Sequence, residues 1–277
     1  MRPEKIAVKM ENLFFIREGR ALLDDINLSI IEGRTTLILG IAGSGKTTLL
    51  KAAAGLLIPD SGRLQIRGKD LINISKKELE VIRRNNGFVF QDGALWADMS
   101  IEGNLSLPLL FHNPGIDKKE IDEKINYWIH RTGFWDTIKG RPAAYSMGEQ
   151  KMISFIRAVI NGPNMLFLDN PLELVDYRGS RNILEILKEF KEKGCTLIIV
   201  SQAPEVLQNL ADDIIIIHEG KIIESGPAKS VLASTNENTK RVISNIREYE
   251  KIYIIENAET DKNIGNSKVG LADEVQD

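Results

Sequence analysis

The sequence predicts an α/β fold with a mostly parallel sheet, and three observations lead to this prediction. Continuous apolar runs such as 35–39, 165–168 and 197–200 are typical of strands buried on both faces. Segments of helical length separate these runs, and the alternation of strands with helices is the pattern of a parallel sheet. A glycine-rich loop at 40–45 joins the first of these runs to a predicted helix.

The individual elements follow in chain order. The segments 6–10 and 26–30 alternate apolar and polar residues, as half-buried strands do. The middle of the chain, about 93–144, is expected to be helical, and Asp117 and Glu120 have the spacing of a capping box that starts one helix there. We further expect helices at 46–54, 148–159 and 180–193, and strands at 35–39, 64–66, 87–90, 165–168, 197–200, 214–217 and 221–223.

The composition excludes several classes of protein. Apolar residues make up 43% and charged residues 27% of the 277 residues, which is typical of a folded globular protein. The formal net charge of −3 argues against a nucleic-acid partner. No run of about 18 apolar residues predicts a membrane span, and no secretory signal is visible. The single cysteine, Cys195, fits a reducing compartment and is expected to be a buried hydrophobe.

The strongest motif is the phosphate loop, residues 40–47, which fits G-x-x-x-x-G-K-[ST]. Its glycines let backbone N–H groups approach phosphate oxygens, and the N-terminus of the following helix attracts anions. The lysine is expected to reach the β- and γ-phosphates, and the first threonine hydroxyl to bind Mg²⁺. The predicted nucleotide-binding residues here are Gly40, Ile41, Ala42, Gly43, Ser44, Gly45, Lys46, Thr47 and Thr48.

Further motifs follow the phosphate loop in a fixed order. Gln91 comes after a strand, Ser146–Glu149 stand before a helix, and Asp169 ends an apolar strand, with Asp176 seven residues later. With the phosphate loop, this order resembles the ATP-binding cassette of ABC transporters over about residues 8–226. The resemblance implies a P-loop NTPase (RecA-like) core with an antiparallel β subdomain and an inserted α-helical subdomain.

The resemblance also implies the ligands and partners. Gln91 matches the glutamine that binds Mg²⁺, Asp169 the carboxylate behind the metal, and Asp176 the aspartate of the D-loop. Ser146, Met147, Gly148 and Glu149 match the signature loop, which contacts the ATP held by a second cassette chain. The implied cofactors are ATP and Mg²⁺. The implied partners are an integral membrane permease, which would hold the chain at the cytoplasmic face of the inner membrane, and a second cassette in a homo- or heterodimer.

Two segments look like one branch of this family. Residues 91–109 and the Phe15-Ile16-Arg17 context are similar to the ATP-binding subunit of Mla/Mce-type lipid transporters. In that branch an arginine takes the place of the aromatic residue that stacks on adenine, and a guanidinium can also lie over a base. The resemblance therefore implies a phospholipid substrate and a base contact for Arg17, while the residue alone is equally typical of an exposed loop charge. We expect an ATP-binding domain at 1–257, with its helical subdomain at about 93–150, and an acidic, mobile tail at 258–277.

Four positions depart from the family pattern. Asn170 stands where the general-base glutamate is usual and Gln202 where the switch histidine is usual, and neither amide can accept a proton as those groups do. Met147 replaces a glycine, and Glu149 a glutamine, in the signature loop. We therefore expect ATP to bind and its hydrolysis at this chain's own site to be slow. A neighbouring carboxylate, Glu173, could substitute for the base only along a different loop path.

Two other functions stay open at this point. In the first, the chain is a nucleotide-dependent structural or regulatory module that binds ATP without turnover. In the second, it is a soluble cassette protein that acts on nucleic acid or ribosomes, which the acidic balance argues against.

Overall fold

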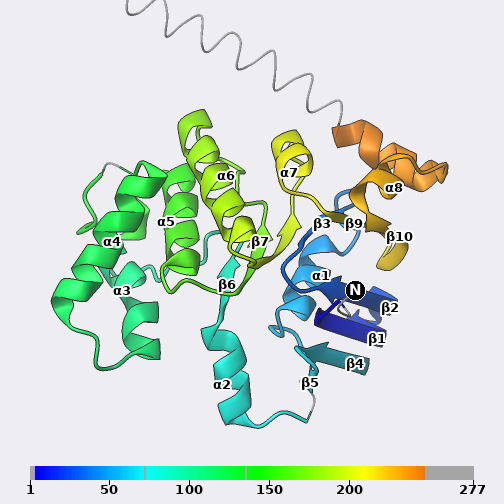
Figure 1. Cartoon of the computed structure of the whole chain (residues 1–277), viewed down its shortest axis with the longest axis horizontal. Helices are drawn as coiled ribbons and strands as arrows, with labels where there is room; N and C mark the ends of the chain where they lie inside the picture. Colours follow the sequence, from blue (N-terminus) through cyan, green and yellow to red (C-terminus); the bar gives the residue numbers. More distant parts are fainter. Residues whose placement is uncertain (1–3, 72, 135, 247–277) are drawn as a thin grey trace, which may run out of the picture.

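The computed structural model describes residues 4–71, 73–134 and 136–246, and its centre is a six-stranded sheet (Figure 1). The strand order is β10-β9-β3-β8-β7-β6, in which β10 runs antiparallel to β9 and the other neighbours are parallel. These strands are β3 (Thr35–Leu39), β6 (Asn86–Val89), β7 (Met165–Asp169), β8 (Thr196–Val200), β9 (Asp213–His218) and β10 (Lys221–Pro227). The predicted α/β fold is confirmed.

Two hydrophobic cores cover the two faces of this sheet. Every residue of β3, β7 and β8 is buried, and alternate residues of a strand belong to different cores. Ile38 packs in the core that also holds Leu49 and Leu50 of α1 (Lys46–Ala53). Leu37 packs in the other core, which includes residues of α5 (Met147–Val159), α6 (Tyr177–Glu192) and α7 (Pro204–Asn209). Burial on both faces explains why these strands read as continuous apolar runs.

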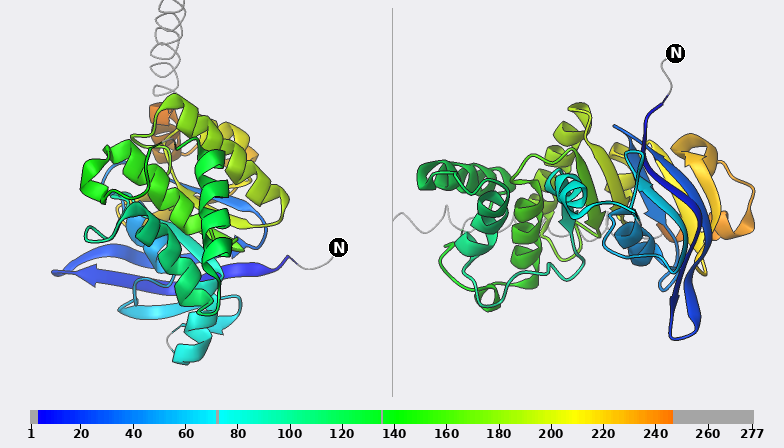
Figure 2. Two further views of the ribbon diagram at one scale, coloured as in Figure 1. Left: turned by 90° about the vertical axis from the view of Figure 1, so that its left-hand side faces the viewer. Right: turned by 90° about the horizontal axis from the view of Figure 1, so that it is seen from below.

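A second, antiparallel sheet packs on the α1 side. Its order is β2-β1-β4-β5, with β1 (Ile6–Arg17), β2 (Arg20–Ile31), β4 (Ser61–Ile66) and β5 (Lys69–Asp70). Figure 2 shows the long β1–β2 hairpin extending along one side of the molecule. Its apolar side joins the same core as α1, through residues such as Met10 and Leu28. The hairpin therefore supports the helix that follows the phosphate loop.

A helical region lies at the far end of the sheet from this hairpin (Figure 1). It contains α3 (Ile101–His112), α4 (Lys118–Thr132), the short 3-10 helix η1 (Pro142–Ala144) and the outer side of α5, around a third core. Two further helices, α2 (Lys76–Arg84) and α8 (Ala228–Leu232), lie elsewhere in the chain and were not expected from the sequence.

The structure corrects some predicted boundaries. Helix α6 begins at Tyr177 rather than residue 180, because Asp176 caps it by accepting a hydrogen bond from the Gly179 N–H (2.6 Å). At α4 only half of the predicted capping box forms: Asp117 accepts from the Glu120 N–H. The predicted tail at 258–277 lies outside the described residues. In the described part of the chain, no helix combines the length and apolar character needed to cross a bilayer.

Candidate functional site

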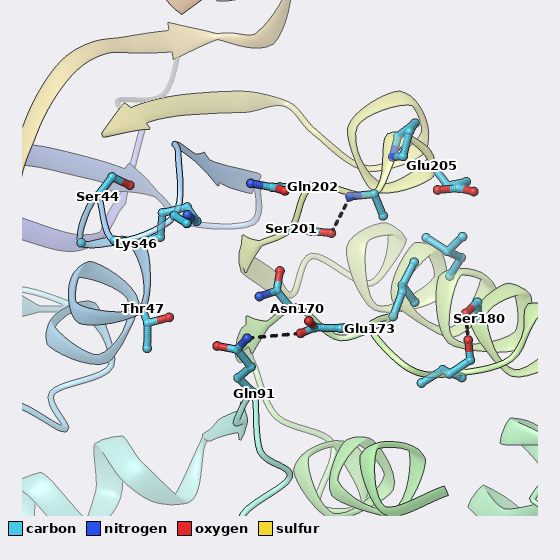
Figure 3. Close-up of a pocket in the computed structure, with 18 of the residues that line it drawn as sticks. Ser44, Lys46, Thr47, Gln91, Asn170, Glu173, Ser180, Ser201, Gln202 and Glu205 are labelled. Carbon is cyan, nitrogen blue, oxygen red and sulfur yellow. Dashed lines mark hydrogen bonds between the residues drawn. The ribbon is translucent and has the colours of Figure 1, made fainter. Parts of the chain in front are cut away.

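A cavity of about 910 Å³ opens at the carboxyl ends of the parallel strands (Figure 3). The phosphate loop after β3, Gln91 after β6, Asn170 after β7 and Gln202 after β8 all line it. The helix after β3, α1, packs on one face of the sheet, and the helix after the neighbouring β8, α7, packs on the other. The cavity therefore lies where α/β sheets usually bind ligands. The fold thus brings together four segments that are far apart in the sequence.

The phosphate loop has a backbone that only glycine allows at several points. Gly43 and Gly45 have φ of 73° and 104°, in the left-handed region that other residues rarely adopt. A Cβ on Gly40 would lie 2.3 Å from the Ile217 carbonyl oxygen. The N-cap of α1 is Gly45, which brings no side-chain oxygen to this helix end. Its first N–H groups therefore face the cavity as an anion site.

The Lys46 ammonium bends back over the loop. It donates to the carbonyl oxygens of Gly40 (2.9 Å) and Ile41 (2.8 Å). Burial lowers the pKa of Lys46, and the negative charge of Asp169 opposes that shift. A partly desolvated cation beside open N–H groups is well placed to receive an oxyanion.

The carboxylate of Asp169 has the surroundings expected of a group that works with a cation. Asp169 is 1% exposed, and its carboxylate oxygens make no close hydrogen bond among the described residues, although the Thr47 hydroxyl lies near enough to interact with them. Burial raises its pKa, while the Thr47 hydroxyl and the positive charge of Lys151 lower it. A buried carboxylate without partners is costly unless a positive charge joins it.

The oxygen atoms near Asp169 fit Mg²⁺. Thr47 offers a hydroxyl and Gln91 an amide oxygen, and both residues line the cavity. Within the described residues, no group of three or more His, Cys, Asp or Glu side chains could hold a metal ion on its own. This agrees with Mg²⁺ sites of nucleotide-binding proteins, where one or two carboxylates act together with phosphate oxygens.

Two amides line the cavity at the positions where the sequence resemblance implies proton-transferring groups. Asn170 lines the cavity with φ of 46°, and its N–H donates to the Val200 carbonyl (2.8 Å). Gln202 also lines the cavity, and its Nε2 donates to the Gly40 carbonyl (3.4 Å). Both side chains can orient a hydrogen-bonded group, but neither can take up a proton at neutral pH.

The sequence left open whether Glu173 reaches the site, and in the structure Glu173 lines the cavity. Its Oε2 accepts a hydrogen bond from Gln91 Nε2 (3.3 Å), and Figure 3 shows the two side chains meeting below Asn170. The loop makes this possible with left-handed backbone at Asn170 (φ 46°) and Leu174 (φ 65°). Since neither residue is glycine, no signal in the sequence predicts that turn.

Other predicted site residues lie outside this cavity. Arg17 stands at the end of β1 with its guanidinium 4.7 Å from the centroid of the Phe15 ring, and it does not line the cavity. Gly40 and Ile41 belong to the phosphate loop but do not line the cavity, and their carbonyls accept from Lys46. Asp169, buried at the end of β7, is not among the lining residues either. The signature-loop positions, Ser146, Met147, Gly148 and Glu149, start α5 and are also absent from the lining.

Glu149 has a local partner. Its Oε2 accepts from the backbone N–H and the hydroxyl of Ser146 (both 2.7 Å), while the Glu149 N–H donates to Ser146 Oγ (3.3 Å). This capping box satisfies the N-terminus of α5. Gly148 packs against the Leu174 carbonyl so closely that a Cβ would lie 2.2 Å from that oxygen, and Met147 is 54% exposed.

Sequence reasoning missed Lys151. Although only 3% exposed, its ammonium donates to the carbonyls of Phe90, Gln91 and Asp169, each at 2.9 Å. Burial lowers its pKa, and the charge of Asp169 opposes this. The one available signal was its place in α5 beside the apolar residues Met152 and Ile153, where a charged side chain needs buried partners. The sequence also did not predict the outer wall of the cavity, which is formed by Tyr177, Ser180, Arg181 and Glu205.

Comparisons with known proteins find relatives of this chain. The model of a family described as ABC transporter matches residues 23–173. Methionine import ATP-binding protein MetN of Rhizobium johnstonii is 33% identical over 229 residues, which are 82% of this chain and 63% of that protein. Macrolide export ATP-binding/permease protein MacB of Salmonella choleraesuis is 32% identical over 76% of this chain and 32% of its own length. The chain therefore spans less than two thirds of either relative.

A solved structure has the same fold. The ATP-binding cassette MJ0796, in a dimeric post-hydrolysis state bound to ADP and Pi, aligns with a TM-score of 0.74 and 27% sequence identity. The alignment covers 80% of this chain and 99% of that one.

Proposed function

Because the chain belongs to the ABC transporter family, we propose that it is the ATP-binding subunit of a membrane transport complex and binds ATP with Mg²⁺ in the cavity described above. The observation that carries this proposal is the intact phosphate loop beside the buried Asp169, whose carboxylate oxygens make no close hydrogen bond among the described residues. The proposed domain is residues 1–257, with the helical subdomain at about 93–150.

Several residues in and around the cavity have roles in this proposal. The phosphate-loop N–H groups and Lys46 would hold the phosphates, and the Thr47 hydroxyl and the Gln91 amide oxygen would hold Mg²⁺, with Asp169 behind it. Bound Mg²⁺ neutralises phosphate charge. On binding, Lys46 would exchange its carbonyl partners, Gly40 and Ile41, for phosphate oxygens. Thr48 and Arg17 belong to the proposed site as well, Arg17 through a nucleotide base outside the cavity.

Hydrolysis at this site is proposed to be slow. Asn170 and Gln202 line the cavity at the base and switch positions, and loss of a positioned acid–base group costs about 10²–10⁴-fold in rate. The signature loop supports the same conclusion. Glu149 holds the Ser146 hydroxyl in the cap of its own helix, and its negative charge would oppose a phosphate brought by a second cassette.

The proposed partners are an integral membrane permease and a second cassette chain, and the proposed location is the cytoplasmic face of the inner membrane. Large apolar side chains near α3 are exposed, namely Trp96 (62%), Leu110 (44%) and Phe111 (71%), and they could contact a permease. A lipid substrate is supported by the Mla/Mce-like segment 91–109 and by Arg17. The names of two relatives, a methionine import protein and a macrolide export protein, refer to other cargoes.

ATP binding and phosphate release by three purified variants test this function. We expect the wild type to bind ATP and release phosphate slowly, Lys46→Ala to lose binding, and Asn170→Glu to keep binding and release phosphate faster. Rapid release by the wild-type chain alone, abolished by Lys46→Ala, would contradict slow hydrolysis. Affinity capture from solubilised membranes tests the partners, because recovery without any membrane protein contradicts a transporter subunit.

A second candidate function is a nucleotide-dependent structural module that never turns ATP over. The Ser146–Glu149 capping box and the two cavity amides favour it over a fast ATPase. Phosphate release with the membrane partner present separates the two functions: any Lys46-dependent release favours the transporter subunit.

A further inference from the structure

Two separate interactions hold Gln91. Its side-chain Nε2 donates to Glu173 Oε2 at 3.3 Å, and its main-chain carbonyl accepts from Lys151 Nζ at 2.9 Å. The contacts come from different parts of the chain, since Glu173 follows β7 and Lys151 belongs to α5. Gln91 is thus held by two separate parts of the chain, of which the loop after β7 lines the cavity.

The Glu173 contact decides which end of the Gln91 amide faces the cavity. A carboxylate only accepts hydrogen bonds, so it selects the NH₂ end of the amide. The carbonyl end, Oε1, is then turned to the side of the cavity on which Thr47 lies (Figure 3). Oxygen is the atom that Mg²⁺ requires, whereas the NH₂ end would repel it.

The position of Glu173 also sets its electrostatic effect. Its charge raises the pKa of Asp169, and it supports the charged form of Lys151. Glu173 therefore adds negative charge near the buried carboxylate, which favours a cation at that point. Unlike Asp169, the Glu173 side chain is exposed, so its contact with Gln91 contributes little to folding.

From this geometry we infer that Glu173 is a positioning residue for the metal that accompanies ATP. It acts through Gln91, by fixing the amide with Oε1 toward the Mg²⁺ site, and it does not replace the missing base at position 170. This inference rests on the proposed ATP–Mg²⁺ binding. A partner that orients a metal ligand typically contributes about 10–100-fold to metal affinity.

Two substitutions of Glu173 separate this role from others. Glu173→Ala removes the acceptor, so the gain in ATP affinity on adding Mg²⁺, compared with EDTA, should fall about tenfold. Glu173→Gln keeps an acceptor oxygen for Gln91 and removes the charge, so it should keep most of that gain. Glu185→Ala, an exposed residue of α6 outside the cavity, is the matched control and should equal the wild type.

The measurement is equilibrium ATP binding by the full-length chain with Mg²⁺ and with EDTA, alongside the melting temperature without nucleotide. The inference is supported if Glu173→Ala loses most of the Mg²⁺-dependent gain in ATP affinity at an unchanged melting temperature, while Glu173→Gln keeps that gain. It is overturned if Glu173→Ala keeps the wild-type preference, or if Glu173→Gln loses as much as Glu173→Ala. A wild type that binds no ATP in either buffer instead overturns the proposed function itself.

Discussion

At the scale of single residues, hydrogen-bond partners separate two buried charges beside the phosphate loop. Asp169 and Lys151 are both almost fully buried, yet their partners differ. Lys151 uses its three donors on three main-chain carbonyls, whereas the two carboxylate oxygens of Asp169 make no close hydrogen bond in the described part of the chain. A satisfied buried charge organises the structure, and an unsatisfied one marks the place where a ligand charge belongs.

Lys151→Met should destabilise the fold strongly. Methionine has a similar length but no donor, so the carbonyls of Phe90, Gln91 and Asp169 would lose their partner inside the protein. We expect a loss of about 3 kcal/mol in the free energy of unfolding. Urea unfolding followed by circular dichroism measures it, with Lys118→Met, an exposed residue of α4, as the control. Equal stability of the two variants would show that these contacts do not matter.

Cys195 should be unreactive in the folded protein. It is 5% exposed, and burial raises its pKa to about 12. At pH 8 the thiolate is therefore about 10⁻⁴ of the native population, against roughly a quarter for an ordinary cysteine of pKa about 8.5. Labelling with iodoacetamide at pH 8 should be slow in buffer and fast in urea. Equal rates in both solvents would refute the buried assignment.

At the scale of elements, the cap of α5 has a role that the sequence alone did not predict. The family resemblance places Glu149 in the loop that contacts a second cassette's nucleotide, but its carboxylate accepts from Ser146 and completes a capping box. The Glu149 side chain thus stabilises the N-terminus of α5, independently of any contact with a partner. The same residue can carry both properties because the helix N-terminus is also the signature loop.

Substitutions at Glu149 should separate these two properties. Glu149→Ala removes the contact to the Ser146 N–H, and we expect a loss of about 1 kcal/mol in the free energy of unfolding. Glu149→Gln retains an acceptor oxygen and should stay within a few tenths of a kcal/mol of the wild type. Chemical unfolding of both variants measures the difference. An equal loss in both would mean that the negative charge, rather than the acceptor, stabilises α5.

How far the sequence predicted each element depends on where its stabilising partners lie. Strands β3, β7 and β8 were predictable because burial on both faces forces apolar residues at every position. The six-residue helix α7, which begins at Pro204, is too short for a helical spacing of apolar residues to be detected. The early start of α6 depends on one Asp176 contact, and the path of Glu173 depends on positive φ at Asn170 and Leu174. Tertiary packing determines these local conformations, and the spacing of apolar residues in the sequence does not reveal them.

At the scale of the whole molecule, the cavity forms only when distant segments meet. The phosphate loop was recognisable because its backbone requirements fall within eight consecutive residues, 40–47. Gln91, Asp169 and Gln202 were placed by their order in the family, and the parallel sheet brings them to one edge. The outer wall from α6 and α7 has no sequence motif, so only the tertiary structure assigns it. Ligand binding should consequently stabilise the whole assembly of these segments.

ATP with Mg²⁺ should raise the melting temperature of the wild-type chain. A ligand at 100 times its Kd that binds only the folded state adds about 2.7 kcal/mol. For a chain of this size that corresponds to roughly 5–10 °C. Lys46→Ala should show no such rise, because it removes the cation that receives the phosphates. The comparison must be made within each variant, since Lys46 also donates to Gly40 and Ile41 and its loss alters the nucleotide-free protein. An equal ATP-dependent rise in Lys46→Ala would place the nucleotide outside the phosphate loop.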